Sequence, residues 1–346
     1  MAENDAHGPP LDQVPADAVR ADVELYDMSD VADFSWHSVL KATGDEWTCV
    51  AWCMDVGLLS KAMTCPKCPC AMTYDAAKKR WRCRRRACDG LGNVQIGVRT
   101  GLWFQRSKLP MTKVVRVLFA WASRRPVSAV VAEEELSMET GVDWYNYCCE
   151  LCSMEMLLTP MMVGGPGVTV EIDETSMKKK SKYNRGRHYP EHWVFGGVDR
   201  ATGKWFGVIT GADRTKPTLS RLIKKHVSPG SHIISDKFGS YVSSNEQHTL
   251  ANNPLLADQG YTHEWVNHTE NFVNPINGAH TQSIEGAWEI RIKRFSKAMR
   301  GMHRPHLPSY LDEYLWRSWF FAHGSDSKAY FKGFVCAIRR YNATVQ

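Results

Sequence analysis

Three acidic residues stand where a strand is predicted to end or a helix to begin. Asp173 closes the β-branched run VTVEI, Asp236 closes HIIS, and Glu285 lies in the first turn of a predicted helix. In open sheets, ligand-binding groups gather beyond the carboxyl ends of strands, so neighbouring strands would bring the two aspartates close enough to share a cation. A helix that crosses that end of the sheet would add Glu285. Because carboxylates are the ligands that Mg²⁺ and Mn²⁺ prefer, the three acids predict a divalent metal site.

Phosphoryl transfer is the chemistry that such a site performs. Two ions about 3.5–4 Å apart can bind both the attacking and the leaving oxygen of an in-line displacement. Without metal, mutual repulsion should raise the pKa of at least one carboxyl group. Other acids compete for the role: Glu171 precedes Asp173 by two residues and so shares its face of the strand, whereas Glu174 faces the other side. Asp199 and Asp213 also lie near strand ends, but turn roles suit them better.

A second group of residues has the spacing of a metal site. Cys65 and Cys68 form CPKC, Cys83 and Cys88 form CRRRAC, and fourteen residues separate the inner members. This spacing is typical of a zinc ribbon, in which four thiolates bind Zn²⁺ and hold together a segment too polar to build a core. The second pair is wider than usual, and Cys70 lies close enough to replace a neighbour. Free thiols in a loop are the alternative interpretation.

The composition is that of a folded protein, with 346 residues of which 43% are hydrophobic, and the length favours two or three domains. No long uncharged apolar run occurs, so a membrane span is not expected. The first 33 residues are acidic and rich in Pro and Ala, which predicts a flexible arm rather than a secretory signal. We therefore expect an intracellular protein whose 11 cysteines are reduced.

Basic residues are clustered, although the net charge is only +6. The clusters are Lys78–Arg86, Lys178–Arg187 and Arg291–Arg300, a distribution typical of nucleic-acid binding; solvated surfaces are the alternative. The residues predicted to contact DNA phosphates are Lys78, Lys79, Arg80, Arg82, Arg84, Arg85, Arg86, Arg185, Arg187, Arg291 and Lys293.

The region before the acids is predicted to be helical. The pattern indicates a helix over Met111–Ala122, a second over Ala129–Leu136 capped by Ser128, a turn at Ser137–Val142, and a third from Asp143. This is the outline of a helix-turn-helix unit, and a plain helical bundle is the alternative.

From Gly164 onward the pattern predicts a mixed α/β sheet flanked by helices. The predicted strands are Val168–Ile172, Trp193–Val198, Lys204–Thr210, His232–Ser235 and His263–Val266, with helices at Lys216–Val227 and from Ser283 toward Met299.

The amino-acid sequence around the acids resembles that of a known family. The stretch VEIDETSMKKKSKYNRGRHYPEHWVFGGVDRATGKWFGVI is similar to the first catalytic block of Merlin-type DNA transposases and their bacterial insertion-sequence relatives. IISDKFGSY resembles their second block, and VNHTENFVNPINGAHTQSIEGAWEIRIKRF their third, so that the match covers roughly Val168–Trp319. The resemblance implies a ribonuclease H-like fold with Asp173, Asp236 and Glu285 as the metal-binding acids. It also implies cleavage of DNA at element ends and joining to target DNA, and it supports a zinc ribbon.

The sequence departs from this family at one place. In the family a Lys or Arg often lies two helical turns after the third acid, but Ile292 stands here between Arg291 and Lys293. One step along a helix turns a side chain by about 100°, so either neighbour is a candidate for a phosphate contact. His268 and His280 lie near Glu285, where structural hydrogen bonding is favoured over contact with metal or phosphate.

The sequence as a whole predicts a cut-and-paste DNA transposase. The expected domains are an acidic arm (1–33), short helices with the ribbon (34–108), a helix-turn-helix-like region (109–163), the catalytic domain (164–325) and a tail (326–346). The expected cofactors are two Mg²⁺ or Mn²⁺ ions per active site and structural Zn²⁺. The expected partners are double-stranded DNA and further copies of the chain, in the nucleus of a eukaryote or the cytoplasm of a bacterium. The rivals are a domesticated protein that binds DNA without cutting it, a zinc-ribbon regulator, and a nuclease without strand transfer.

Overall fold

The computed structural model describes residues 26, 34–85, 88, 94–177, 192–294, 304–322 and 324–345. The chain divides into two compact units. The sheet unit contains Ser153–Trp319, and the helical unit contains Glu24–Cys152 with Phe320–Gln346. Within the described ranges, no helix combines the length and the apolar character needed to cross a membrane.

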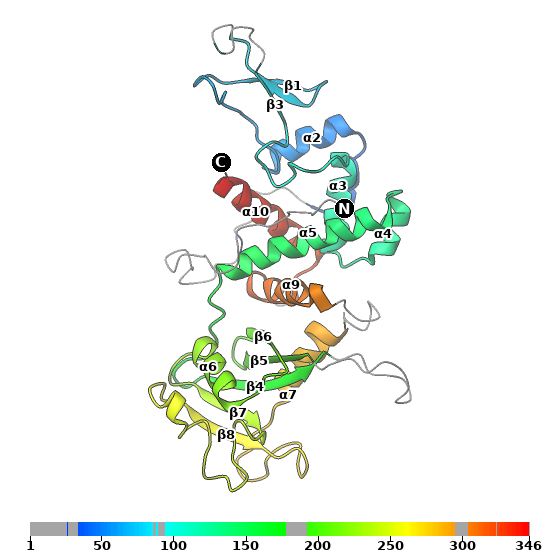
Figure 1. Cartoon of the computed structure of the whole chain (residues 1–346). Coiled ribbons are helices and arrows are strands. Elements are labelled where there is room, and N and C mark those ends of the chain that lie inside the picture. Colours follow the sequence, from blue (N-terminus) through cyan, green and yellow to red (C-terminus); the bar gives the residue numbers. More distant parts are fainter. Residues whose placement is uncertain are drawn as a thin grey trace. The chain divides into compact units, whose positions relative to one another are not determined.

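The sheet unit is built on five strands in the order β6-β5-β4-β7-β8, which can be followed in Figure 1. Strands β4, β5 and β6 form an antiparallel meander, whereas β7 and β8 continue the sheet in parallel with β4. This order and these directions confirm the predicted ribonuclease H-like mixed sheet. The strands span Thr169–Ser176 (β4), Trp193–Asp199 (β5), Trp205–Gly211 (β6), His232–Asp236 (β7) and Thr262–Val266 (β8).

Helices pack on this sheet. Helix α7 contacts β4 and β5, and α9 contacts β6. Fully buried Val170, Ile172 and Phe195 belong to the core on the other face of the sheet, where Phe195 packs on Phe206 and the Phe206 ring stacks on His226 of α6. The helices of the unit span Lys216–His226 (α6), Gln282–Ala287 (α7), Trp288–Lys293 (η5, a π-helix that continues α7) and Leu307–Trp319 (α9), with short 3₁₀ turns at Pro254–Leu256 and Arg304–His306.

Strand β4 is longer than predicted. It continues beyond Asp173 because β5 pairs with it as far as Ser176, which lies opposite Trp193. Asp173 therefore lies inside a strand and not at its end, and the prediction that it closes the strand is wrong. The parallel neighbour β7 does end at Asp236, as predicted.

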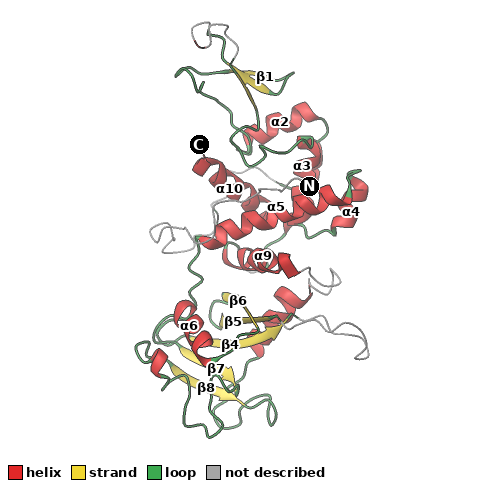
Figure 2. Cartoon of the chain, in the orientation of Figure 1, coloured by secondary structure: helices red, strands yellow, loops and turns green. Residues whose placement is uncertain are grey.

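The helical unit carries the second sheet, which Figure 2 shows as a separate group of strands. This sheet has the order β1-β2-β3 and is antiparallel. Helix α3 contacts α1, α2, α4 and α10, and Phe331 packs edge-on against Phe34 and Phe119 at 5.2 Å between ring centroids. The elements span Trp36–Ala42 (α1), Glu46–Asp55 (α2), Thr73–Asp75 (β1), Arg80–Arg82 (β2), Gln95–Gly97 (β3), Met111–Ala122 (α3), Val127–Glu133 (α4), Met138–Leu157 (α5) and Ser327–Val345 (α10).

The predicted turn at Ser137–Val142 is wrong. Helix α5 begins at Met138, where Ser137 Oγ accepts a hydrogen bond from Thr140 N at 3.1 Å. Gly141 lies inside the helix, and a Cβ atom there would stand 2.3 Å from Val131 Cγ2 of α4. The glycine thus permits close packing of α4 on α5 and does not mark a turn. Helix α4 likewise begins before Ser128, with Pro126 as its N-cap. The helix-turn-helix assignment and the domain boundaries stay predictions.

Candidate active site and cysteine centre

Asp173 and Asp236 are brought together by the pairing of β4 with β7. In this parallel pair Glu171 lies opposite Ile234, so that continuing the register by two residues places Asp173 level with Asp236. Asp236 is anchored further, because its Oδ1 atom accepts a hydrogen bond from Phe238 N at 3.1 Å. The expectation that the two strands are neighbours is confirmed.

Glu285 reaches the same region from α7, where it lies in the first turn as predicted. On the same helix, one turn later, Trp288 Nε1 donates a hydrogen bond to Asp173 Oδ2 at 3.1 Å. Thr281 Oγ1 donates to Glu285 Oε1 at 2.9 Å, and His268 Nε2 lies 3.4 Å from that oxygen. His268 also lies 2.8 Å from Thr281 Oγ1, which is the structural hydrogen bonding favoured for it. The helix that carries Glu285 is therefore hydrogen-bonded to Asp173 through Trp288.

Burial and neighbouring acids raise the pKa values of Asp173 and Asp236. Burial, followed by the charge of Asp236, raises the pKa of Asp173 to about 7, and Glu285 adds to the shift. Burial also raises the pKa of Asp236. The expected repulsion among the carboxyl groups is thus present, and a bound cation would relieve it.

Glu174 is a fourth acid in this region. Burial and the charges of Asp173 and Asp236 raise its pKa to about 8, which the nearby cation of Arg214 only partly opposes. Its carboxylate accepts a hydrogen bond from the Tyr241 hydroxyl and lies 3.6 Å from Arg214 Nη1. Asp199 and Asp213, by contrast, accept hydrogen bonds from backbone N–H groups in turns, the role expected of them.

The three predicted acids are spread more widely than the cysteines. Among the described residues, the only group of three or more metal-ligating side chains whose ligand atoms all lie within 4.8 Å of one another is made of cysteines. The ligand oxygens of Asp173, Asp236 and Glu285 therefore do not all lie within 4.8 Å of one another.

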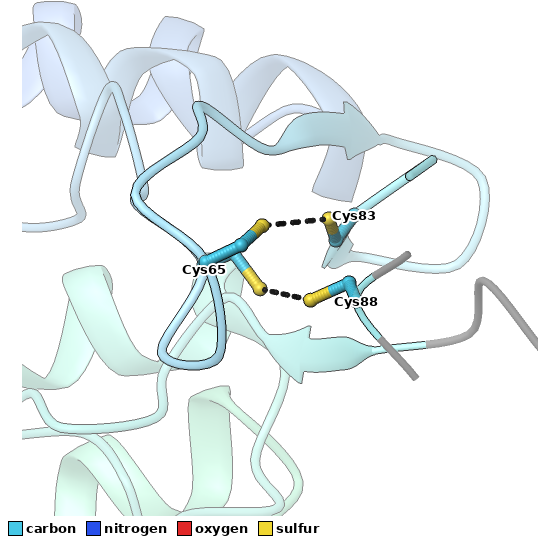
Figure 3. A group of neighbouring side chains, drawn as sticks. Cys65, Cys83 and Cys88 are labelled. Carbon is cyan, nitrogen blue, oxygen red and sulfur yellow. Dashed lines mark hydrogen bonds between the residues drawn. The ribbon is translucent and has the colours of Figure 1, made fainter. Parts of the chain in front are cut away.

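The four cysteines predicted to bind zinc form that group: Cys65, Cys68, Cys83 and Cys88. Cys65 Sγ lies 3.2 Å from Cys88 Sγ, and Cys68 Sγ lies 3.7 Å from Cys83 Sγ (Figure 3). Cys70, the alternative ligand, is outside the group. Burial opposes ionisation of Cys65, but hydrogen bonds from the Lys67 backbone and Cys88 outweigh it and lower the pKa of Cys65 to about 7.

A small core holds the two cysteine pairs in place. Trp81 of β2 is buried with Cys65, Cys83 and Met72, and its ring lies 5.1 Å from that of Tyr74 on β1.

The basic residues predicted to contact DNA are in different situations. Lys78 is exposed in the turn between β1 and β2, and Arg84 and Arg85, which follow Cys83, are also exposed. Lys79 Nζ lies 3.0 Å from Glu46 Oε1 and Arg82 Nη1 lies 3.6 Å from Asp75 Oδ2. Arg80 is half-buried. Arg86, Arg185 and Arg187 lie outside the described residues.

The part of the chain that contains the three acids matches a known protein family. Residues 163–318 match the family model described as the ISXO2-like transposase domain. The predicted insertion-sequence type is thereby confirmed, while the assignment to Merlin-type elements stays a prediction. A search of curated proteins finds no match to this chain.

Solved structures similar to this chain include viral integrases. The catalytic core domain of HTLV-2 integrase in complex with magnesium, dimeric form, is 13% identical, covers 44% of this chain and 86% of its own, and has a TM-score of 0.27. A simian T-cell lymphotropic virus intasome in complex with the PP2A regulatory subunit B56 gamma is 14% identical, covers 61% and 72%, and has a TM-score of 0.30.

Sequence reasoning missed several residues that position the acids of the transposase domain. Trp288 follows Glu285 by three residues, a spacing that places both on one face of a helix, so the signal was present. Tyr241 and Arg214 carried no such signal, because only the fold brings them to Glu174.

The transposase domain also distinguishes the two basic neighbours of Ile292. Arg291 donates hydrogen bonds to Gly203 O at 2.9 Å and to Ser318 Oγ at 2.8 Å, and Ile292 is 2% exposed. These residues lie in the π-helix η5, in which each turn holds more residues than in an α-helix. The position eight residues after Glu285, which is Lys293, therefore turns back toward the face of that acid.

Proposed function

We propose that this protein is a DNA transposase that uses Asp173, Asp236 and Glu285 to hold two Mg²⁺ or Mn²⁺ ions. The reaction would be hydrolysis of a phosphodiester at the end of a mobile element, followed by attack of the terminal 3′-hydroxyl on target DNA. The observation that supports this most is the alignment of Asp173 with Asp236 across β4 and β7, inside a transposase domain.

A pair of ions would need acids that are spread over a wider space than one ion does. Ligand oxygens of Mg²⁺ lie about 2.0–2.1 Å from the ion, and paired ions lie about 3.5–4 Å apart, so the outermost carboxylates could be separated by about 8 Å. Asp173 has the other two acids as electrostatic neighbours, so it would help to hold the ions.

The side chains around the acids would orient them for this chemistry. The Trp288 indole holds one oxygen of Asp173, and Thr281 holds one oxygen of Glu285. When bound, the metal pair would activate the attacking oxygen and neutralise charge on the leaving one. The protein's own part is to hold ionised carboxylates together and to leave their remaining oxygens available.

We also propose that the four clustered cysteines bind structural Zn²⁺. Four sulfur atoms within 4.8 Å of one another fit a tetrahedral zinc site. Lys78 in the turn between β1 and β2, and Arg84 and Arg85 next to Cys83, are exposed and would contact phosphates of double-stranded DNA, so that binding weakens steeply as salt rises. Joining two element ends to one target requires two active sites, which favours a homodimer or a larger assembly.

The decisive experiment incubates the purified chain with candidate terminal DNA and Mg²⁺, then sequences the products. Asp236→Ala should abolish cleavage and leave binding to the ends nearly intact. Cut ends without joined products would identify a nuclease that lacks strand transfer. No metal-dependent cleavage by the wild type on its cognate ends would refute the proposal and favour a domesticated DNA-binding protein.

A further inference from the structure

A buried carboxylate stands beside the catalytic acids without being one of them. Glu171 lies on β4 two residues before Asp173, on the same face of the strand, and its side chain is 0% exposed. Its Oε2 atom accepts a hydrogen bond from the backbone N–H of Ile284 at 2.9 Å. Its Oε1 atom accepts from Arg200 Nε at 2.5 Å. Since an isolated buried charge is costly, these two bonds explain how the carboxylate is tolerated.

Arg200 connects Glu171 to the segment that leads into α7. Its Nη2 group donates a hydrogen bond to His280 O at 2.9 Å and lies 3.2 Å from the His280 ring. The backbone N–H of Arg200 donates to Thr169 O at the start of β4. His280 Nδ1 in turn lies 3.7 Å from Glu171 Oε1. One ion pair thus ties together β4, the turn after β5, and the residues just before α7.

These contacts attach α7 to β4 at two points. Glu171 binds the amide of Ile284, the residue immediately before Glu285. Asp173 binds the indole of Trp288, the residue three positions after Glu285. The third acid therefore lies between two attachments to the strand that carries the first acid. The helix segment that carries Glu285 cannot slide along β4 without breaking one of them.

We propose that Glu171 and Arg200 form a clamp that positions Glu285 relative to Asp173, and that neither residue binds metal or DNA itself. Both carboxylate oxygens of Glu171 are occupied by N–H donors, which leaves them poorly placed as metal ligands. Glu171 is accordingly a positioning residue. The inference rests on the proposed metal site and names the device that assembles it.

The test measures binding of Mn²⁺ to the full chain by isothermal titration calorimetry without DNA, beside thermal unfolding. Glu171→Gln and Arg200→Gln each remove the ion pair, and the double variant removes both charges. The expected result is an affinity about tenfold or more below wild type in each single variant, the scale seen when groups that orient metal ligands are changed. The double variant should lose no more than the worse single variant, because the pair acts as one unit.

A matched control separates positioning from general stability. Arg317 Nε and Glu313 Oε1 form another buried pair in the same unit, 2.8 Å apart, with side chains 2% and 9% exposed. Glu313→Gln should lower the melting temperature and leave Mn²⁺ affinity at the wild-type level. If Glu171→Gln does not fold, Arg200→Lys is measured instead, because the Arg200 side chain is partly exposed. This substitution keeps the positive charge but removes the planar guanidinium that bonds Glu171 and His280 O together.

Three outcomes would overturn the clamp. Wild-type Mn²⁺ affinity in both single variants would show that the pair positions nothing. Weak binding in Glu171→Gln together with normal binding in Arg200→Gln would make Glu171 a metal ligand. Equal weakening in Glu313→Gln would reduce the effect to stability. Failure of the metal site itself is a different result, in which wild type and Asp236→Ala bind Mn²⁺ alike.

Discussion

At the scale of single residues, the acids of the transposase domain are held in an unfavourable state that a cation would relieve. Asp173 is largely buried, and its pKa is raised to about 7 by burial and by its acidic neighbours. Such a residue contributes less to the stability of the empty protein than an exposed aspartate does. In the function we propose, Asp173 binds metal, because the repulsion that disfavours the ionised site would become attraction when a divalent ion enters.

The raised pKa of Asp173 predicts how pH and metal act together. Between the unfolded value near 4 and the folded value of about 7, only the folded state holds the proton, so Asp173 makes unfolding easier as pH rises through this window. Metal binds the ionised form, so the rise in melting temperature on adding Mg²⁺ should be larger at pH 8 than at pH 6. Scanning fluorimetry with and without Mg²⁺ measures this. Asp173→Asn should reduce the pH dependence, to which Asp236 and Glu174 also contribute because their pKa values are raised as well. An unchanged profile in that variant would contradict the assignment.

The hydrogen bond from Trp288 predicts a separable effect on activity. Trp288→Phe removes the N–H that donates to Asp173 and keeps most of the aromatic packing against Trp205, whose ring lies 5.9 Å away. The expected result is a cleavage rate roughly 10- to 100-fold lower, since groups that orient metal ligands have effects of this size. The melting temperature should also fall, because the smaller ring leaves a cavity at this buried position, so the rate is measured well below it. A normal rate would show that the indole only fills space.

At the scale of elements, the fit of α7 and η5 against β5 depends on a missing side chain. A Cβ atom at Gly196 would lie 2.4 Å from Trp288 Cη2 and 2.4 Å from Phe206 O. Both distances are shorter than real Cβ contacts, so the helix or the neighbouring strand would have to move. The glycine pair in WVFGGV is thus part of the active-site framework although it carries no chemistry.

Gly196→Ala should therefore impair both stability and cleavage. We expect a loss of about 1–3 kcal/mol in the free energy of unfolding, the usual cost of overpacking, because Trp288 is displaced. Urea denaturation and a cleavage assay measure the two effects. Gly239→Ala is the matched control, since a Cβ there meets nothing within 4 Å. Equal behaviour of the two variants would argue against the packing explanation.

The π-helix η5 predicts different roles for the two basic residues after the third acid. Arg291→Ala should lower the melting temperature, because its guanidinium bonds Gly203 and Ser318. Lys293→Ala should leave the melting temperature unchanged. If Lys293 contacts a phosphate, its loss should also reduce the slope of log affinity against log salt by about one. DNA-binding titrations over a range of salt measure this slope, and an effect of Arg291→Ala alone would reverse the assignment.

At the scale of the whole molecule, the chain carries its two proposed metal sites in different units. The cysteine centre lies in the helical unit and the acidic site in the sheet unit. Since the core of the ribbon is small, its fold should depend on the bound ion.

Cys83→Ser should therefore act on one unit. We expect loss of bound zinc, measured by elemental analysis, and faster proteolysis within residues 63–97. The melting shift caused by Mg²⁺ should persist, because the acids belong to the other unit. Binding to DNA should weaken if Lys78, Arg84 and Arg85 contact phosphates. Loss of the Mg²⁺ response in this variant would contradict the independence of the two sites.

What the sequence by itself determined about this protein is local. The β-branched runs predicted the five strands β4 to β8, and the cysteine spacing predicted the four clustered thiols. The similarity of three sequence blocks to a known family pointed to the acids. These features depend on residues near one another in the chain, so pattern and propensity suffice to find them.

Only the tertiary structure decided how those parts meet. The register of β4 with β7 aligns Asp173 with Asp236, and pairing with β5 extends β4 beyond the predicted end. Helix α5 begins earlier than its sequence indicated, and Gly141 lies inside it against Val131 of α4. The sequence alone did not indicate a role for Glu171, because its hydrogen bonds with Arg200 and Ile284 are made only in the folded chain. Each of these contacts joins different elements, and their choice depends on long-range packing that no local pattern encodes.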